Sequence, residues 1–357
     1  MRELTIDGVR IADDEPCWVC AEIGHNHQGK VEQALALIEE CATAGASAVK
    51  FQKRDNDAIY TRALLHQPYE NEHSYGKTYG AHRKALEFGE SAYRECYAVA
   101  NSFDISAFAT AFDERSADFL MALGTPALKL ASGDLTNTPL LDYVARLGVP
   151  LILSTGGGTF EDIDRAVNTV AKHTNAFAVL HCTASYPVHA WEELNLRVIP
   201  TLRTRYPDTV IGWSGHDSGI AMSVIAYTLG ARIIEKHVTR NRALKGTDHA
   251  FSLEPAGLRK LVRDLDRARR ALGDGMKVKY PSEVGPLRKM AKSLVAVKPL
   301  AAGHVLTRED LARKSPADGL PPYLLESVIG FPLALPLTTD EALTYDHLRS
   351  ACDVAAS

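Results

Sequence analysis

The 357-residue sequence lacks several features that define particular classes of protein. It has no apolar run of the ~18 or more residues that a membrane-spanning helix needs, and its N-terminal segment lacks the apolar core of a signal peptide. It has no excess of basic residues, because 40 lysines and arginines stand against 44 aspartates and glutamates, for a formal net charge of −4. We therefore expect a cytoplasmic protein that binds neither a membrane nor nucleic acid.

Cysteine is scarce and shows no metal-binding pattern. Six cysteines stand at positions 17, 20, 41, 96, 182 and 352, and the one CxxC pair, Cys17 and Cys20, falls inside an expected strand. Residues three apart in a strand face opposite sides, and no second pair completes a zinc site. We interpret the cysteines as free thiols that pack like small apolar side chains.

The sequence does contain a regular alternation of short apolar runs and amphipathic stretches. Near-continuous apolar strands separated by helices are typical of a parallel sheet covered on both sides. Eight such units predict a (β/α)8 (TIM) barrel over residues 1–273. An open doubly wound sheet is the alternative, but no GxGxxG loop follows the first expected strand. The expected strands are 17–24, 46–52, 105–112, 127–132, 149–156, 177–184, 210–216 and 231–238.

The chain changes character after the expected barrel. Residues 274–292 are rich in glycine, proline and charge, which is typical of a linker. Residues 293–357 contain short strand-like runs between turns and no helical period, so we expect a small second domain there. Within the part of the sequence expected to form the barrel, residues 53–90 make a connection that is too long for a plain loop.

Polar, chemically useful side chains stand at the ends of the expected strands. The active site of a TIM barrel lies at the C-terminal ends of its strands, and period-two spacing puts Lys50 and Gln52 on one face. A lone histidine on an apolar strand is usually a core residue, but polar residues at all eight strand ends favour a site. They are Glu22, Lys50, Gln52, Thr110, Lys129, Ser132, Ser154, Ser185, Ser214, His216, Glu235 and His237.

These residue types predict a particular chemistry. His216 and His237, with a carboxylate nearby, suit a divalent cation such as Mn²⁺. Lysines, hydroxyls and the glycine-rich turn at residues 154–158 suit phosphate or carboxylate, because such a turn presents backbone N–H groups. Together they predict a phosphorylated, carboxylate-bearing substrate that reacts with a carbonyl electrophile.

Seven motifs, in their order along nearly the whole chain, resemble those of the sialic acid synthase family. The resemblance implies a TIM barrel followed by a small C-terminal antifreeze-like (SAF, β-clip) domain. Segments 73–80 (HSYGKTYG) and 86–88 (LEF) are most similar to the eukaryotic type, which makes an N-acylneuraminate 9-phosphate. The motifs are AEIGHNHQG (21–29), KFQ (50–52), KLASGD (129–134), HCTASYP (181–187), GWSGH (212–216), EKH (235–237) and KGTDH (245–249).

The resemblance implies a condensation of phosphoenolpyruvate (PEP) with N-acetylmannosamine 6-phosphate or mannose 6-phosphate. C3 of PEP would attack the sugar aldehyde, water would add at C2, and phosphate would leave by C–O cleavage. The product would be a nonulosonic acid 9-phosphate. A domain-swapped homodimer, in which the SAF domain covers the neighbour's active site, is also implied.

The resemblance also implies roles for the metal-binding, proton-transfer and PEP-binding residues. His216 and His237 would bind a divalent metal, Mn²⁺ or Mg²⁺. Glu22 and Asp134 would contact the sugar and are candidates for proton transfer. The implied PEP contacts are Lys50, Thr110, Lys129, Ser132, Ser154, Ser185 and Ser214.

The sugar would have further contacts. The resemblance assigns Tyr186 and Asp248 to the sugar. A 6-phosphate must also meet positive charge, and our hypothesis places it against Lys77, Arg83 and Lys84 of the long connection.

Three departures from the bacterial pattern of the family bear on the substrate. Ala184 replaces a common asparagine, so Ser185 takes over its contact with PEP, and Asp134 replaces a glutamate. In the tail, Lys314-Ser-Pro316 replaces a motif whose arginine contacts the N-acetyl group. The last change leaves room for a sugar without an acyl group, which would give the deaminated acid (KDN) 9-phosphate.

Other functions remain open at this point. The nearest are a synthase for an unphosphorylated N-acylmannosamine and another PEP-dependent ulosonate synthase. A Schiff-base aldolase that uses Lys50 or Lys129 is a different class and leaves both histidines unexplained. A non-enzymatic saccharide- or ice-binding protein would leave the polar rim unexplained.

Overall fold

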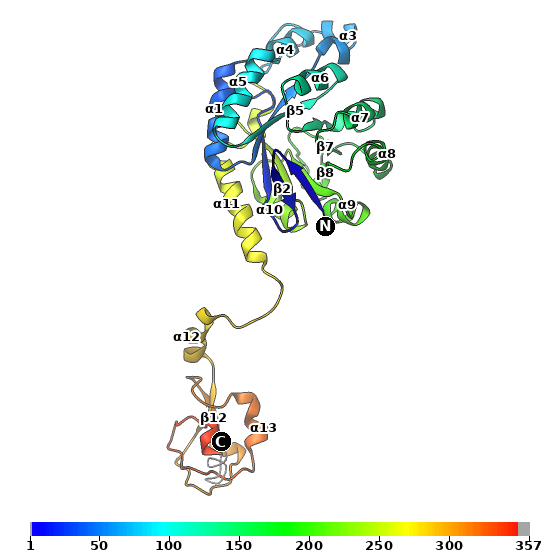
Figure 1. The fold of residues 1–357 in the computed structure, drawn as a ribbon. Helices are drawn as coiled ribbons and strands as arrows, with labels where there is room; N and C mark the ends of the chain where they lie inside the picture. Colours follow the sequence, from blue (N-terminus) through cyan, green and yellow to red (C-terminus); the bar gives the residue numbers. More distant parts are fainter. Residues whose placement is uncertain (1, 349–357) are drawn as a thin grey trace. The chain divides into compact units, whose positions relative to one another are not determined.

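A computed structural model describes residues 2–348, which divide into two compact units, one ending at Gly273 and the other beginning at Asp274 (Figure 1). The first unit contains a closed barrel of eight parallel strands, which confirms the TIM-barrel prediction. No helix among these residues is long and apolar enough to span a membrane. The barrel strands are β3 (Trp18–Glu22), β4 (Ala48–Lys53), β5 (Ser106–Ala111), β6 (Leu128–Leu130), β7 (Leu151–Ser154), β8 (Phe177–Cys182), β9 (Val210–Gly215) and β10 (Ile233–His237).

Helices surround the barrel on its outer side (Figure 1). Their apolar faces pack against the outward side chains of the strands in one large buried cluster. The helix α8 begins at a capping box, in which Thr159 and Asp162 exchange side-chain and backbone hydrogen bonds. The helices of this layer are α1 (Val31–Ala44), α5 (Glu90–Ser102), α6 (Glu114–Ala122), α7 (Thr138–Ala145), α8 (Phe160–Val170), α9 (Val198–Arg205), α10 (Ala221–Thr228) and α11 (Pro255–Leu272).

The inside of the barrel changes from apolar to charged along each strand. Side chains two residues apart point the same way, so Trp18 and Cys20 precede Glu22 on the inner face of β3. The apolar members join the antiparallel hairpin β1 (Glu3–Ile6) and β2 (Val9–Ala12) in a second buried cluster. Apolar packing thus fills one end of the barrel and leaves the charged side chains at the C-terminal mouth.

The connection over residues 53–90 contains three short helices, α2 (Asn56–Ile59), α3 (Arg62–His66) and α4 (Tyr79–Leu86). It is held to the loop after β10, because the hydroxyl of Tyr75 donates to the carbonyl of Lys245. Rings of Tyr69, Tyr79 and His82 pack together inside the connection.

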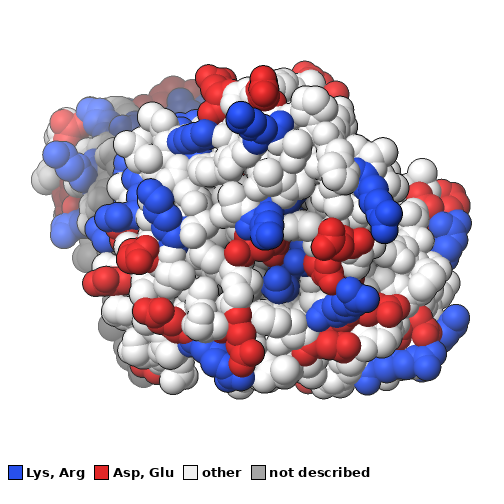
Figure 2. All heavy atoms as spheres, turned by 90° about the horizontal axis from the view of Figure 1, so that it is seen from above, with Lys and Arg blue, Asp and Glu red and all other residues white. Residues whose placement is uncertain are grey.

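Positive and negative side chains are interspersed on the face seen in Figure 2 rather than gathered by sign.

The second unit has a core of its own. An antiparallel pair, β11 (Ser293–Ala296) and β12 (Leu311–Lys314), packs with leucines from the surrounding turns. Residues 274–292, expected as a linker, include the helix α12 (Pro281–Met290), and a single helical turn, α13 (Leu325–Val328), follows β12. The sequence did not predict α12, and α13 departs from the absence of a helical period expected over residues 293–357.

The described cysteines are free thiols, as predicted. Four of them are buried, and burial raises the pKa of the Cys96 thiol to about 12. Cys352 lies outside the described residues.

Asp310 organises the turn between the two strands of the second unit. Its buried carboxylate accepts hydrogen bonds from His304 at 2.7 Å and from the backbone N–H of Thr307 at 3.0 Å, and it pairs with Lys298 at 2.9 Å. Burial opposes its ionisation, but these partners outweigh that effect and hold the pKa of Asp310 well below its usual range.

We expect Asp310→Asn to lower the free energy of unfolding of the second unit by about 1–3 kcal/mol, because charge-assisted hydrogen bonds are lost. The ionised carboxylate contributes fully above the ordinary Asp pKa of about 3.9, and its contribution is lost as the pH falls toward the lowered pKa. Hydrogen-exchange mass spectrometry of peptides from residues 293–348, in urea at pH 7, measures the change. Asp340→Asn, which removes an exposed ion pair with Lys314, is the matched control. Equal protection in both variants would contradict this account.

Candidate active site

A cavity of about 530 Å³ opens at the C-terminal mouth of the barrel. The structure brings most of the predicted site residues to its walls, although they come from seven strand ends, from the loops after β8 and β10 and from helix α4. Those that line it are Glu22, Lys50, Gln52, Arg83, Thr110, Lys129, Ser132, Ser154, Tyr186, Ser214, His216, Glu235, His237 and Asp248.

Two buried lysines and two buried glutamates form the floor of the cavity. Lys50 pairs with Glu22 at 2.6 Å and donates to the hydroxyl of Thr110 at 2.8 Å. Lys129 pairs with Glu235 at 3.3 Å. Strands β6 and β10 lie opposite each other in the order of the barrel, so the second pair crosses its interior.

The two glutamates differ in their tendency to take up a proton. Burial opposes the ionisation of Glu235, but Lys129 and Lys50 outweigh it and lower its pKa to about 2. At Glu22 burial prevails over the attraction of Lys50 and raises the pKa. Carboxyl groups whose pKa values are pushed apart take different roles in acid–base chemistry. Glu22 is therefore the better proton carrier, and Glu235 is a fixed charge.

The two histidines lie side by side above this floor, with ring centroids 5.4 Å apart. Nδ1 of His216 lies 3.0 Å from the carbonyl oxygen of Thr183, so it carries the proton and leaves Nε2 with a free lone pair. Burial lowers the pKa of His237 to about 4, although Asp248 at 3.6 Å opposes the shift. His237 is therefore neutral at neutral pH, and an imidazole nitrogen with a free lone pair is the form that binds a metal.

Three serines, which we call the serine wall, complete the mouth of the cavity, namely Ser132, Ser154 and Ser214. The backbone N–H of Gly156 donates to the hydroxyl of Ser132 at 3.0 Å. A Cβ at Gly156 would lie 2.8 Å from that hydroxyl and 2.9 Å from the Cβ of Ala184, so only glycine fits this close approach. The glycine-rich turn thus holds Ser132 beside the end of β7.

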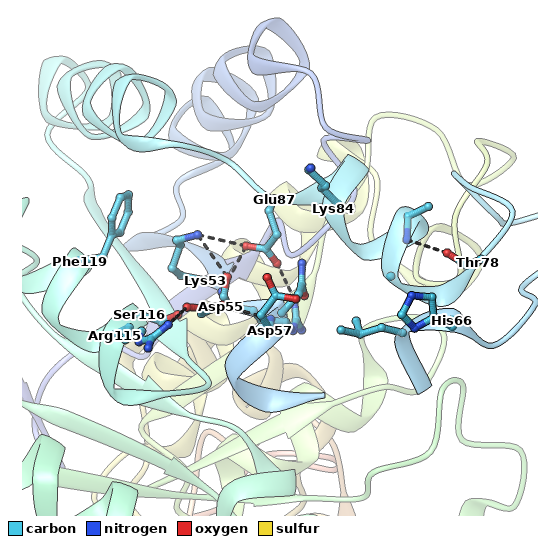
Figure 3. A pocket seen from close by; sticks show the side chains of 15 residues that line it. Lys53, Asp55, Asp57, His66, Thr78, Lys84, Glu87, Arg115, Ser116 and Phe119 are labelled. Carbon is cyan, nitrogen blue, oxygen red and sulfur yellow. Dashed lines mark hydrogen bonds and ion pairs between the residues drawn. The ribbon is translucent and has the colours of Figure 1, made fainter. Parts of the chain in front are cut away.

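Four expected residues do not line this cavity. Asp134 lies in a 3₁₀ turn after β6, accepts a hydrogen bond from Asn137 at 3.1 Å and faces a neighbouring cavity. The hydroxyl of Ser185 donates to the carbonyl of Pro187, and its neighbour Ala184 lines the site instead. Lys77 is exposed. Lys84 lines a separate cavity of about 670 Å³ beside Lys53 and Glu87 (Figure 3).

Sequence reasoning missed several residues that line the cavity, among them His25, Arg54 and Cys182. Arg54 continues the period-two series of Lys50 and Gln52, and that spacing was the available signal. His25 lies in a loop, where no periodicity indicates the direction of a side chain.

Removal of one partner from a buried ion pair leaves an uncompensated charge. We expect Lys129→Met to lower the free energy of unfolding of the barrel by about 3 kcal/mol, because Glu235 then keeps only the hydroxyl of Ser214 at 3.1 Å and the more distant ammonium group of Lys50 at 3.8 Å. Urea unfolding followed by tryptophan fluorescence reports on the barrel alone, since all three tryptophans lie in it. The added change Glu235→Gln should recover most of the loss, and a double variant no more stable than Lys129→Met would contradict the pairing.

Comparison with known proteins gives matches over both units. The model of the NeuB family matches residues 37–277, and that of the SAF domain matches residues 291–349, which confirms the expected C-terminal domain. N-acetylneuraminate-9-phosphate synthase of Mus musculus is 36% identical over 341 residues and 95% of each chain. N,N'-diacetyllegionaminic acid synthase of Legionella pneumophila is 32% identical over 94% of this chain and 95% of its own. The crystal structure of N-acetylneuraminic acid synthetase from Leptospira borgpetersenii, in complex with citrate, has a TM-score of 0.70 and 34% identity, covering 80% of this chain and 95% of that chain.

Proposed function

The chain belongs to the NeuB family of sialic and related nonulosonic acid synthases, and we propose that it condenses PEP with a 6-phosphorylated hexose. The sugar is N-acetylmannosamine 6-phosphate or mannose 6-phosphate, and the products are a nonulosonic acid 9-phosphate and inorganic phosphate. The observation that carries the proposal is the meeting of Lys50, Lys129 and a serine wall with two histidines, His216 and His237, in one cavity.

The floor suits PEP, which carries a phosphate and a carboxylate. Lys50 and Lys129 supply charge, and Thr110, Ser132, Ser154 and Ser214 supply hydroxyl donors around them. Both lysines are fixed by the glutamates, so their ammonium groups are oriented before the substrate arrives. Preorganised charge of this kind costs little reorganisation during the reaction.

The proposed reaction forms one C–C bond and breaks the C–O bond between PEP and its phosphate. C3 of PEP forms a bond to C1 of the open-chain sugar, and the aldehyde oxygen takes up a proton to become a hydroxyl. Water adds to C2, and the C2–O bond to the phosphate breaks, which leaves a keto group and inorganic phosphate. Of the two protons of the water, one balances the proton taken up by the aldehyde oxygen and the other leaves with the phosphate. Glu22, whose pKa is raised by burial, exchanges a proton with the reacting oxygen atoms.

A divalent cation, Mn²⁺ or Mg²⁺, belongs to the proposal. The residues fit it, because His216 has its tautomer fixed by Thr183, and Nδ1 of His237 is buried without a hydrogen-bond partner. No cluster of three or more His, Cys, Asp or Glu side chains able to hold a metal occurs among residues 2–348, so water or substrate would complete the coordination. When bound, the cation would polarise the sugar aldehyde.

A homodimer and a cytoplasmic location stay predictions. The swapped arrangement is supported by the SAF domain match and by side chains such as Met276, Tyr280 and Met290, which are apolar and exposed. The side chain of Lys314, which belongs to the segment that stands in place of the family's Arg-Pro motif, pairs with Asp340. This pairing supports a sugar site that does not depend on Lys314.

The proposal is tested by incubating the purified protein with PEP and Mn²⁺. The release of phosphate and the formation of the nonulosonic acid are measured. N-acetylmannosamine, its 6-phosphate, mannose 6-phosphate and arabinose 5-phosphate are assayed separately, with and without EDTA. We expect turnover of at least one 6-phosphorylated hexose, lost with EDTA and restored by added Mn²⁺. Turnover of arabinose 5-phosphate alone would mean a shorter ulosonate product, and turnover that EDTA leaves unchanged would contradict the metal assignment.

A further inference from the structure

Three side chains outside the floor form a second group in the cavity wall. Arg54 follows β4, His25 follows β3, and Arg83 lies in the last turn of α4. All three line the same cavity as the lysine–glutamate floor. The motifs and the mechanism described above leave His25 and Arg54 without a role.

The imidazole of His25 lies between the two guanidinium groups. A nitrogen of Arg54 lies 2.7 Å from Nε2 of His25, and a nitrogen of Arg83 lies 3.4 Å from Nδ1. Burial and the two arginines lower the pKa of His25 well below its usual range, so the ring is neutral. A neutral imidazole accepts one hydrogen bond and donates one. It can therefore satisfy only one of the two guanidinium groups that face it.

The charge of this group is only partly compensated. The carboxylate of Glu87 lies 3.6 Å from Arg54, but it also pairs with Lys53 at 3.5 Å on its other side (Figure 3). No carboxylate among residues 2–348 lies within 4.0 Å of the Arg83 side-chain nitrogens. Nε of Arg54 is buried and has no hydrogen-bond partner. The wall therefore keeps excess positive charge and unused donors.

Both guanidinium groups are held in place. Arg54 is 6% exposed, stacks over the ring of Phe112 at 3.9 Å and donates to the side-chain carbonyl of Gln52 at 2.5 Å. Arg83 lies over the ring of Tyr79 and donates to its hydroxyl at 2.9 Å. Fixed guanidinium groups lose little conformational freedom when they bind a ligand, and their fork geometry matches phosphate oxygens.

We propose that Arg54 and Arg83, separated by His25, form the subsite that binds the phosphate monoester of the sugar substrate. A phosphate dianion that reaches both guanidinium groups from the cavity would accept the N–H groups that the imidazole cannot satisfy, and it would balance the excess charge. This proposal rests on the proposed condensation, in which the floor lysines bind PEP and leave this wall to the second substrate. It replaces the exposed Lys77 and Lys84 as the phosphate contacts.

The test compares Arg83→Gln and Arg54→Gln with Arg115→Gln, a control that removes the same charge from an arginine that is 78% exposed in its side chain. Steady-state kinetics give KM for N-acetylmannosamine 6-phosphate, for N-acetylmannosamine and for PEP. Calorimetry measures binding of N-acetylmannosamine 6-phosphate in the absence of PEP. Arg83 is only half-buried, so its variant keeps the test valid if the buried Arg54 variant fails to fold.

We expect each subsite variant to raise KM for the phosphorylated sugar roughly 10-fold or more, as loss of a charge-assisted hydrogen bond implies. KM for PEP and turnover of N-acetylmannosamine should stay within about twofold, as should all values for Arg115→Gln. A rise in KM for PEP instead would place PEP at this wall and overturn the proposal, as would unchanged binding of the phosphorylated sugar.

The two proposals fail in different ways. If the wild type turns over no sugar but binds N-acetylmannosamine 6-phosphate, and Arg83→Gln abolishes that binding, the condensation fails and the subsite stands. If the wild type forms the 9-phosphate product and Arg83→Gln does so with the same KM, the subsite fails and the condensation stands.

Discussion

Lys129 and Glu235 face each other from opposite sides of the barrel, and their ion pair joins strands that share no hydrogen bonds. Each buried ion costs several kcal/mol to remove from water, so it persists only with a close partner. The barrel meets this requirement twice, because Lys50 and Glu22 form a second pair beside the first. Apolar packing fills the end of the barrel away from the cavity and supports this arrangement, since it fixes the strands from which the four side chains project.

In the proposed reaction this charge-balanced floor receives PEP, the first of two anionic substrates. The lysines are held by the glutamates without substrate, and the neutral imidazole of His237 adds no positive charge above them. The arginine wall of Arg54 and Arg83 is compensated less completely than the floor. In the proposed reaction the two substrates would therefore meet different environments, a rigid floor of balanced charge for PEP and a wall of excess positive charge for the sugar phosphate.

Much of this site follows from periodicity in the sequence. Lys50, Gln52 and Glu235 could be placed because alternate residues of a strand share a face and the C-terminal ends of barrel strands meet at one mouth. Beyond the strand ends that rule fails. Asp134 enters a 3₁₀ turn and faces another cavity, and His25 reaches the site from a loop, where no periodicity indicates the direction of a side chain. The helix α12 was missed because proline and glycine in its sequence are typical of linkers.

The reaction pathway itself can be measured with PEP that carries ¹⁸O in the oxygen bridging C2 and phosphorus. Mass spectrometry of the released phosphate after a single turnover with the 6-phosphorylated sugar locates the label. Attack of C3 on the aldehyde with addition of water at C2 breaks the C–O bond, so we predict that the label appears in inorganic phosphate. Label retained in the organic product, with none in phosphate, would show P–O cleavage and contradict the mechanism assigned to this site.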